Sequence, residues 1–224
     1  MFVKYLNINE LNIDEILEKV SKERLLKAEK YKSESDKKRS IAVEYLLNEM
    51  ISEGLNRNEI QGVTDFKFPA SITYDSKGKP HIYDTDGMTD LIHFSLSHSG
   101  DYVACMISNV SCGVDIERHS KRPYDKIARR VCKEGEKEAI NSTKEFYDLW
   151  TLKESVLKAV GLGLSLDMRD FEMKKVDFVD EQFDYAETVI HYETKVRDIA
   201  YLGGVLSAPE GYSLSYIEEL NNNR

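Results

Sequence analysis

The sequence predicts an α+β protein of two similar-sized halves, each with a small, mostly antiparallel sheet and packed helices, arranged as a pseudo-dimer. Two observations predict this class. Helical and strand-like patterns alternate twice along the chain, and its 224 residues suit two halves of about 100 residues. We expect the halves to span residues 1–110 and 111–224. Because no Gly/Ser/Pro-rich linker separates them, we expect them to pack tightly.

In the first half, two amphipathic helices are expected after a short apolar strand. Residues 13–31 are rich in Glu, Lys and Leu, and residues 36–53 place apolar side chains on one stripe before Gly54, which suits a C-cap. From Gly62 to Ile107 the pattern changes to short β-like runs. The expected strands, turn and hairpin tip are Phe66–Phe68, Ile72–Tyr74, Ser76–Pro80, Phe94–Ser97, His98–Asp101 and Tyr102–Ile107.

The second half repeats the mixture of helix and strand. Ser142 and Glu145 form a capping-box pattern, and Gly161 and Gly163 end the predicted helix. Strands are expected after Phe171, where apolar and polar residues alternate. The apolar face of the helix and the strands are Phe146, Leu149, Trp150, Val156, Leu157, Val160, Thr188–Tyr192 and Tyr212–Tyr216.

Composition places the chain among globular proteins, with 41% hydrophobic and 32% charged residues. No apolar run approaches the roughly 20 residues that span a bilayer, and Met1–Leu6 lacks the apolar core of a signal peptide, so we expect a cytoplasmic protein. The odd number of cysteines, Cys105, Cys112 and Cys132, predicts free thiols.

The net charge of −9 argues against a general nucleic-acid binder. Residues 118–133 differ from the rest, because they carry seven basic side chains against one acid, Asp125, for a local charge of +6. Such a stretch suits the docking of an acidic partner, and a solvated helix face explains it equally well.

Asp115 and Glu117 lie in an extended apolar segment, Gly113–Glu117. In a strand, Val114 and Ile116 point to one face while the two carboxylates point to the other, about 7 Å apart. A hard cation such as magnesium relieves the repulsion between such carboxylates. The alternative is a strand whose outer face is simply acidic.

Trp150, Glu154 and Lys158 form a line along the predicted helix, and Lys153 lies beside it. Glu154 and Lys158 also make an ordinary i,i+4 pair, but the apolar stripe holds both at the rim of a packed surface. At the hairpin tip, His98 is suited either to local bonding or to donating a hydrogen bond to a phosphate. Lys79 lies in a predicted turn, which is either part of a binding site or an ordinary surface loop.

Three segments together resemble the signature blocks of one family, the 4′-phosphopantetheinyl transferases: Phe94–Gly100, Gly113–Glu117 and Trp150–Leu164. Their order and spacing are similar to those of the longer, two-halved members that activate surfactin synthetase and related assembly lines. The resemblance runs from about residue 20 to residue 165, with departures at Ser95 and Tyr102, where many relatives have Asn and Trp.

The resemblance implies transfer of the phosphopantetheine arm of coenzyme A to a serine of an acyl or peptidyl carrier protein, releasing 3′,5′-ADP. It implies magnesium held by Asp115, Glu117 and Glu154, with Glu154 accepting the serine proton and Lys158 stabilising the departing nucleotide. His98 joins these two as a catalytic candidate. The implied coenzyme-binding residues are Arg24, Lys27, Arg39, Ser40, Lys79, Pro80, Ser97, His98, Lys153 and Lys158.

The basic stretch 118–133 is then the expected docking site of the carrier protein, and we expect a monomer, because both halves lie in one chain. Two other functions stay open. A magnesium-dependent phosphotransferase acting on a nucleotide would be expected to carry a glycine-rich phosphate loop, and the sequence has none. A non-catalytic module that binds coenzyme A or carrier proteins would be expected to lack one of the proposed catalytic residues.

Overall fold

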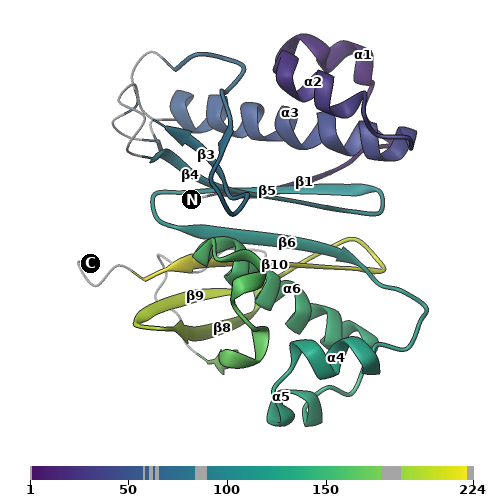
Figure 1. Cartoon of the computed structure of the whole chain (residues 1–224), viewed down its shortest axis with the longest axis vertical. Helices are drawn as coiled ribbons and strands as arrows, with labels where there is room; N and C mark the ends of the chain where they lie inside the picture. The colour runs from purple at the N-terminus through teal and green to yellow at the C-terminus, as the bar shows by residue number, and fades with distance from the viewer. Residues whose placement is uncertain are drawn as a thin grey trace. The chain divides into compact units, whose positions relative to one another are not determined.

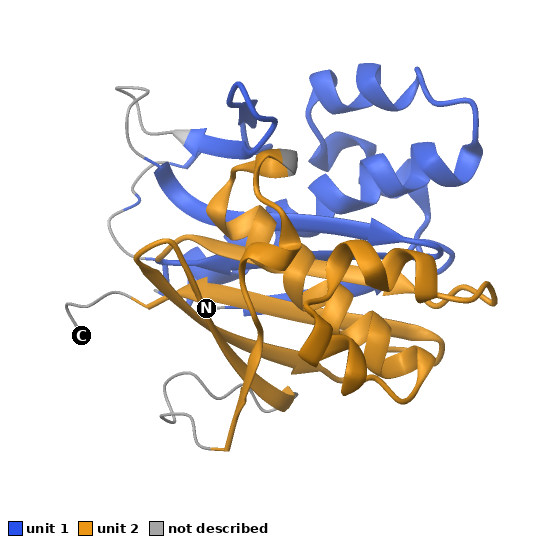
Figure 2. Cartoon of the chain, turned by 60° about the horizontal axis from the view of Figure 1, so that its bottom comes forward, with its two compact units in different colours: residues 1–109 blue, residues 110–224 orange. Residues whose placement is uncertain are grey.

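The computed structural model describes residues 2–57, 59–60, 63, 66–83, 90–177 and 188–220. The chain divides into two compact units, residues 1–109 and 110–224, within one residue of the expected boundary (Figure 2). Each unit has a five-stranded sheet in which all paired strands are antiparallel, with helices packed on it. The predicted α+β class with two similar halves is therefore confirmed.

Unit 1 has the sheet order β1-β5-β4-β3-β2. Its elements are β1 (Phe2–Asn7), α1 (Ile13–Ile16), the 3-10 turn η1 (Leu17–Lys19), α2 (Lys22–Ala28), α3 (Glu34–Asn56), β2 (Thr73–Tyr74), β3 (Pro80–Tyr83), β4 (Asp90–Ser99) and β5 (Tyr102–Ser108). Helix α3 covers one face of the sheet, and α1 and α2 lie against α3 (Figure 1). Between helix and sheet, Leu47 and Met50 of α3 pack with Val103 and Ile107 of β5.

Two helix predictions in unit 1 need correction. The expected helix over residues 13–31 is divided into α1, η1 and α2, because Ser21 takes an extended conformation and its side chain caps α2 by accepting from the Arg24 amide. Gly54 does not cap α3, which runs on to Asn56. A Cβ at Gly54 would lie 2.8 Å from the Ile60 side chain, so this glycine makes room for packing.

The strand predictions in unit 1 are partly correct, because β1, β2, β4 and β5 were expected but β3 was not. Phe66–Phe68 forms no strand, and the start of the predicted β region at Gly62 lies outside the described residues. The β4–β5 hairpin is tighter than expected, since β4 continues through Ser99 and only Gly100 and Asp101 make the turn. Gly100 has a φ of 55°, which suits a residue without a Cβ.

Unit 2 has the sheet order β6-β10-β9-β8-β7. Its elements are β6 (Cys112–Arg118), α4 (Asp125–Val131), α5 (Glu134–Glu138), α6 (Thr143–Val160), the 3-10 turns η2 (Gly163–Ser165) and η3 (Met168–Asp170), β7 (Lys174–Val176), β8 (Thr188–Val196), β9 (Ile199–Leu206) and β10 (Tyr212–Glu219). Both strands predicted near the C-terminus are present, as β8 and β10.

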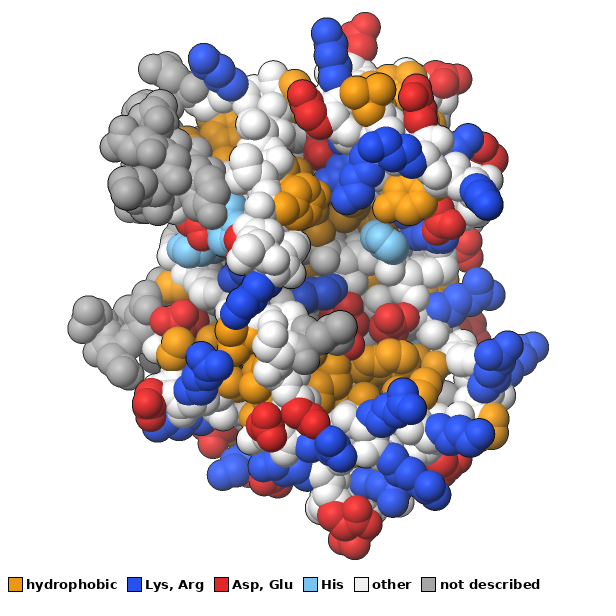
Figure 3. Space-filling view, in the orientation of Figure 1, with side chains coloured by type: hydrophobic (Ala, Val, Ile, Leu, Met, Phe, Trp, Pro, Cys, Tyr) orange, Lys and Arg blue, Asp and Glu red, His pale blue; other side chains and the backbone are white. Residues whose placement is uncertain are grey.

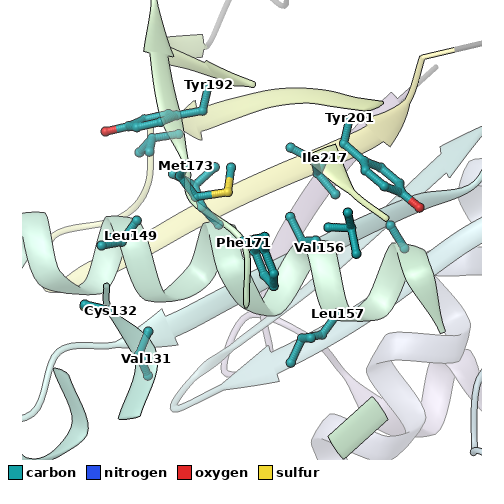
Figure 4. Packing of buried hydrophobic residues seen from close by; sticks show 14 of the residues in the cluster. Val131, Cys132, Leu149, Val156, Leu157, Phe171, Met173, Tyr192, Tyr201 and Ile217 are labelled. Carbon is teal, nitrogen blue, oxygen red and sulfur yellow. The ribbon is translucent and has the colours of Figure 1, made fainter. Parts of the chain in front are cut away.

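Helix α6 packs on β6, β10 and β9 and carries the predicted apolar face into the core of unit 2. Phe171 and Met173, which follow η3, lie against this helix near Val156 (Figure 4). The predicted caps are present, because Ser142 accepts from the Glu145 amide and Gly161 takes the left-handed conformation at φ 70°. The Glu145 side chain returns a bond to the amide of Asn141 rather than to that of Ser142.

Two predictions from composition can also be compared with the structure. Cys105, Cys112 and Cys132 are all buried free thiols, as expected. Within the described part of the chain, no helix is long and apolar enough to cross a membrane.

Candidate functional site

Strand β6 presents Asp115 and Glu117 on the same face as Gly113, against which α6 lies. Val114 and Ile116 point to the opposite face and are fully buried. The predicted alternation is therefore present. Asp115 is itself only 4% exposed, whereas Glu117 is partly exposed. A carboxylate as buried as that of Asp115 needs a positive partner, since burial of an isolated charge is costly.

Gly113 brings α6 unusually close to this strand. A Cβ at that position would lie 1.9 Å from the Ser155 carbonyl oxygen and 2.9 Å from the Ala159 amide nitrogen. Only a residue without a side chain permits this approach. The crossing therefore places residues 154 and 158 of α6, which flank the contact, beside the carboxylate of β6.

Lys158 supplies the positive partner of Asp115. Its ammonium donates to Asp115 Oδ1 at 2.7 Å and to the Val114 carbonyl oxygen at 2.9 Å. The lysine side chain remains 29% exposed, so part of it faces solvent. Of the side chains predicted to form a line along α6, Lys158 therefore contacts strand β6 directly.

Glu154 lies one helical turn before Lys158 and is partly buried. Burial raises the pKa of Glu154, and the nearby charge of Asp115 raises it further. Trp150 Nε1 donates to Glu154 Oε1 at 3.3 Å, and this bond and the charge of Lys158 act in the opposite direction. Asp115, Glu154 and Lys158 therefore form one electrostatically coupled group in unit 2.

Glu117, the third predicted ligand, lies on the same face of β6 as Asp115. In the described parts of the chain, no group of three or more His, Cys, Asp or Glu side chains is placed to hold a metal ion. The set of Asp115, Glu117 and Glu154 as metal ligands stays a prediction. Asp115 and Glu154 still suit a hard cation, because the charge of Asp115 raises the pKa of Glu154 and a lysine ammonium already contacts Asp115.

A polar seam fixes α6 on the neighbouring strand β10. Ser213 Oγ donates to Asp148 Oδ1 at 2.6 Å, and Thr151 Oγ1 lies 2.7 Å from Ser215 Oγ. Ser155 Oγ donates to the Ser215 carbonyl oxygen at 3.0 Å. These bonds run along the sheet-facing side of α6, so they limit its rotation and translation over the carboxylate strand.

Lys153 lies away from this group. Its side chain is fully buried, and its ammonium contacts Glu136 Oε2 at 2.6 Å and the carbonyl oxygens of Met168 and Phe171 at 2.8 and 3.0 Å. A side chain held in this way is not available to a cofactor. The expected coenzyme-binding role of Lys153 has no support from its position.

In unit 1, Arg24 is also largely engaged by the protein. Its side chain is 8% exposed, with Nε donating to Glu44 Oε2 at 2.8 Å and Nη2 to the Tyr74 hydroxyl at 3.0 Å. Lys27, which is exposed, places its ammonium 5.1 Å from the centre of the Tyr74 ring. Arg24 therefore orients the exposed Tyr74, while Lys27 has the more accessible charge of the two.

Arg39 fastens α3 to the hairpin that carries His98. Its guanidinium donates to the Gly100 carbonyl oxygen in the β4–β5 turn and pairs with Asp36 one helical turn earlier. His98 is exposed near the end of β4, whereas the neighbouring Ser97 is buried. Ser40 follows Arg39, and its buried hydroxyl makes no hydrogen bond with the residues that the structure describes.

Lys79 and Pro80 lie at the predicted turn, which joins β2 to β3. Asp75 closes this turn by accepting from the amides of Lys77 and Lys79, and Gly78 takes a φ of 85°. Pro80 is the first residue of β3 and pairs with Tyr74. The turn therefore joins Lys79 to the strand that carries Tyr74.

The basic stretch 118–133 includes α4, where Lys and Arg side chains gather at the lower right of the molecule (Figure 3). Lys126, Arg129 and Arg130 are exposed and form no ion pair with any described residue. Ile127 is 38% exposed among them, whereas Ala128 and Val131 turn into the core. The surface of α4 thus combines accessible positive charge with one apolar side chain.

Several residues that shape the site were not singled out from the sequence. Tyr74, Glu136, Asp148 and the serines of β10 carry no local pattern that separates them from ordinary surface or strand residues. The role of Gly113 could have been predicted, because a glycine inside a strand often indicates that another backbone approaches closely.

Comparison with known proteins agrees with the motifs. A family model described as the 4′-phosphopantetheinyl transferase superfamily matches residues 111–216. The chain is 32% identical over 225 residues to 4′-phosphopantetheinyl transferase gsp of Aneurinibacillus migulanus, covering 96% of this chain and 83% of the relative. It is 30% identical over 161 residues to 4′-phosphopantetheinyl transferase Sfp of Bacillus subtilis, covering 69% of this chain and 66% of the relative.

A shorter region of the chain is similar to a mammalian protein. Over 118 residues the chain is 35% identical to the L-aminoadipate-semialdehyde dehydrogenase-phosphopantetheinyl transferase of Rattus norvegicus, covering 46% of this chain and 37% of the relative.

Proposed function

The chain belongs to the 4′-phosphopantetheinyl transferase superfamily and is an enzyme of that class, and we propose that it transfers the 4′-phosphopantetheine arm of coenzyme A to a serine of an apo acyl or peptidyl carrier protein. The observation that carries this proposal is the coupled group of Asp115, Glu154 and Lys158, assembled where α6 crosses β6 at Gly113. In the reaction, the serine oxygen bonds to the phosphorus of the arm, and 3′,5′-ADP leaves.

Asp115 and Glu154, with Glu117 from the same strand face, are the proposed magnesium ligands. Bound magnesium would neutralise charge on the pyrophosphate of coenzyme A. The donor set supports this assignment, because it consists of carboxylate oxygens and two of the three groups are electrostatically coupled. The side chain of Glu117 is partly exposed and lies on the same face of β6 as Asp115.

Glu154 is the proposed base for the serine proton. Its carboxylate is partly buried and lies one helical turn before Lys158, so the proposed base and the proposed nucleotide-stabilising lysine lie on the same edge of α6. Lys158 is the proposed group that stabilises negative charge on the departing nucleotide, and its contacts with Asp115 and the Val114 carbonyl oxygen support this role by holding its ammonium beside the proposed ligands.

The proposed coenzyme-binding residues lie mainly in unit 1. Lys27, Lys79 and His98 offer charge or hydrogen bonds for phosphates. Arg39 also belongs to this set, and Ser97, Ser40 and Pro80 stay in it as supporting positions. The buried Ser40 hydroxyl has unused hydrogen-bonding capacity with respect to the described residues. We remove Lys153 from the set and give Arg24 the indirect role of orienting Tyr74.

The α4 surface is the proposed docking site for the carrier protein. Lys126, Arg129 and Arg130 suit an acidic helix, and the exposed Ile127 suits an apolar residue on that helix. A local positive surface on a chain with a net charge of −9 would direct such a partner to one face.

Incubation of the chain with coenzyme A, magnesium and an apo carrier protein tests the function. Mass spectrometry should show the carrier gaining one phosphopantetheine arm, with no gain when magnesium is chelated. Glu154→Gln should abolish the transfer, whereas Glu172→Gln, which changes an exposed glutamate of the same unit, should leave it unchanged.

Two results would contradict the proposal. A chain that binds coenzyme A but modifies neither acyl nor peptidyl carriers would be a binding module. Full transfer by the Glu154→Gln enzyme would remove Glu154 as the base.

A further inference from the structure

Lys153 and Glu136 form a buried ion pair in which every polar side-chain atom has a partner. The lysine ammonium has three protons and three acceptors, namely Glu136 Oε2 and the carbonyl oxygens of Met168 and Phe171. Glu136 Oε1 accepts from the Met173 amide at 2.9 Å, and Oε2 also accepts from the Lys133 amide at 2.8 Å. A buried pair this well satisfied is specific in geometry, although such pairs add little net stability.

The pair joins three parts of unit 2 around α6. Glu136 belongs to α5, Lys153 to α6, and the carbonyl oxygens and amide to the segment 168–173 that returns over α6. The Phe171 ring lies 4.9 Å from the lysine ammonium and packs on the same helix (Figure 4). This junction therefore holds α6 from the side away from the polar seam with β10.

Lys153 precedes Glu154 directly, so the two side chains leave the helix about 100° apart. Any rotation or tilt of α6 that displaces Lys153 also displaces Glu154 relative to Asp115. We propose that Lys153 and Glu136 are positioning residues, which set the orientation of α6 so that Glu154 faces Asp115 during phosphopantetheine transfer. This inference rests on the proposed function.

The chain offers an internal reporter of this orientation that needs no activity. Trp150 is the only tryptophan, and its indole donates to Glu154. It is also partly buried against the core of unit 2, so its fluorescence emission changes if α6 moves over that core.

The test compares Lys153→Met and Glu136→Gln with Lys144→Met in the full chain. Lys144 has a largely exposed side chain that pairs with the buried Asp148 one turn along the same helix, so its replacement controls for loss of a lysine from α6. Kinetics are measured well below each melting temperature, where circular dichroism shows folded protein.

We expect both pair variants to lower kcat by roughly 100-fold and to change the KM for coenzyme A and carrier less than threefold, since small displacements of catalytic groups act on kcat. Both should also shift the Trp150 emission. Lys144→Met should keep kcat within twofold of the unmodified enzyme.

Three results would overturn the inference. A folded variant with normal kcat and emission would make the pair purely structural. A raised KM for coenzyme A in Lys153→Met alone, with kcat retained, would make Lys153 a substrate-binding residue. If Lys153→Met does not fold, Glu136→Gln decides, and unchanged kcat and emission there would reject the positioning role. Failure of the unmodified chain to transfer the arm would instead reject the proposed function, and the emission comparison would still test the orientation of α6.

Discussion

At the scale of single residues, the site depends on one position where a side chain is missing. Gly113 lets the backbone of α6 approach β6 so closely that any Cβ would overlap the Ser155 carbonyl oxygen. That contact is rigid, because the obstructing atom belongs to a helix backbone rather than to a flexible side chain. The carboxylate of Asp115 and the ammonium of Lys158 meet as a consequence.

Replacement of Gly113 by alanine should therefore separate the two elements. We expect Gly113→Ala to lower the free energy of unfolding by about 3 kcal/mol, as overpacking does, and to abolish transfer. Gly135→Ala is the matched control, because a Cβ added at Gly135 in α5 would have no neighbouring atom within 4 Å and alanine favours helix. Urea unfolding midpoints measure both. An unchanged midpoint for Gly113→Ala would mean that α6 can accommodate a Cβ at position 113 without loss of stability.

Cys132 adds a prediction about pH. Burial, and secondly the charge of Glu136, raise the pKa of the Cys132 thiol to about 11. The unfolded thiol ionises near its ordinary value of about 8.5, so stability is unaffected below that pH and falls as pH rises toward 11. Cys132→Ala should remove this part of the alkaline loss, seen in unfolding measured at pH 8 and pH 10. Equal losses in the two proteins would show that the thiol does not contribute.

At the scale of elements, the sequence pattern predicted correctly those features of a helix that depend on neighbouring residues in the chain. The apolar stripe of α6 and both of its caps follow from the sequence, because Ser142 and Gly161 act on their immediate neighbours. The break between α1 and α2 was missed, since the signal of Ser21 as a cap competes with strong helix formers around it. Lys153 was placed in the wrong environment, because sequence spacing does not reveal that Glu136 lies opposite it.

The α4 helix is the element whose proposed role is most directly testable by charge. Arg129→Glu with Arg130→Glu should raise the KM for the carrier at least tenfold at low salt and leave the KM for coenzyme A within twofold. Lys174→Glu with Lys175→Glu makes the same charge change on β7, at two exposed lysines outside the proposed site, and should change neither constant. Equal effects of the two double variants would point to net charge rather than to α4.

At the scale of the whole molecule, the sequence predicted the division of the chain better than the assembly of its site. Separate cores form in each unit, because apolar periodicity is local and unambiguous over α3 and α6. The positions of the site carboxylates depend on side-chain rotamers and on nearby charges, and sequence periodicity predicts neither. Asp115 lies close enough to Glu154 to raise its pKa, whereas the shared magnesium site of Asp115, Glu117 and Glu154 stays a prediction.

The presence of two similar units in one chain leads to a prediction about assembly. Each unit has its own sheet and its own hydrophobic core, so neither needs a second copy of the chain to bury its apolar face. We therefore expect a monomer of 25.8 kDa. Sedimentation equilibrium should return this mass with and without coenzyme A, and the specific activity should not depend on enzyme concentration. Activity that falls on dilution, together with a doubled mass, would show that a partner copy completes the site.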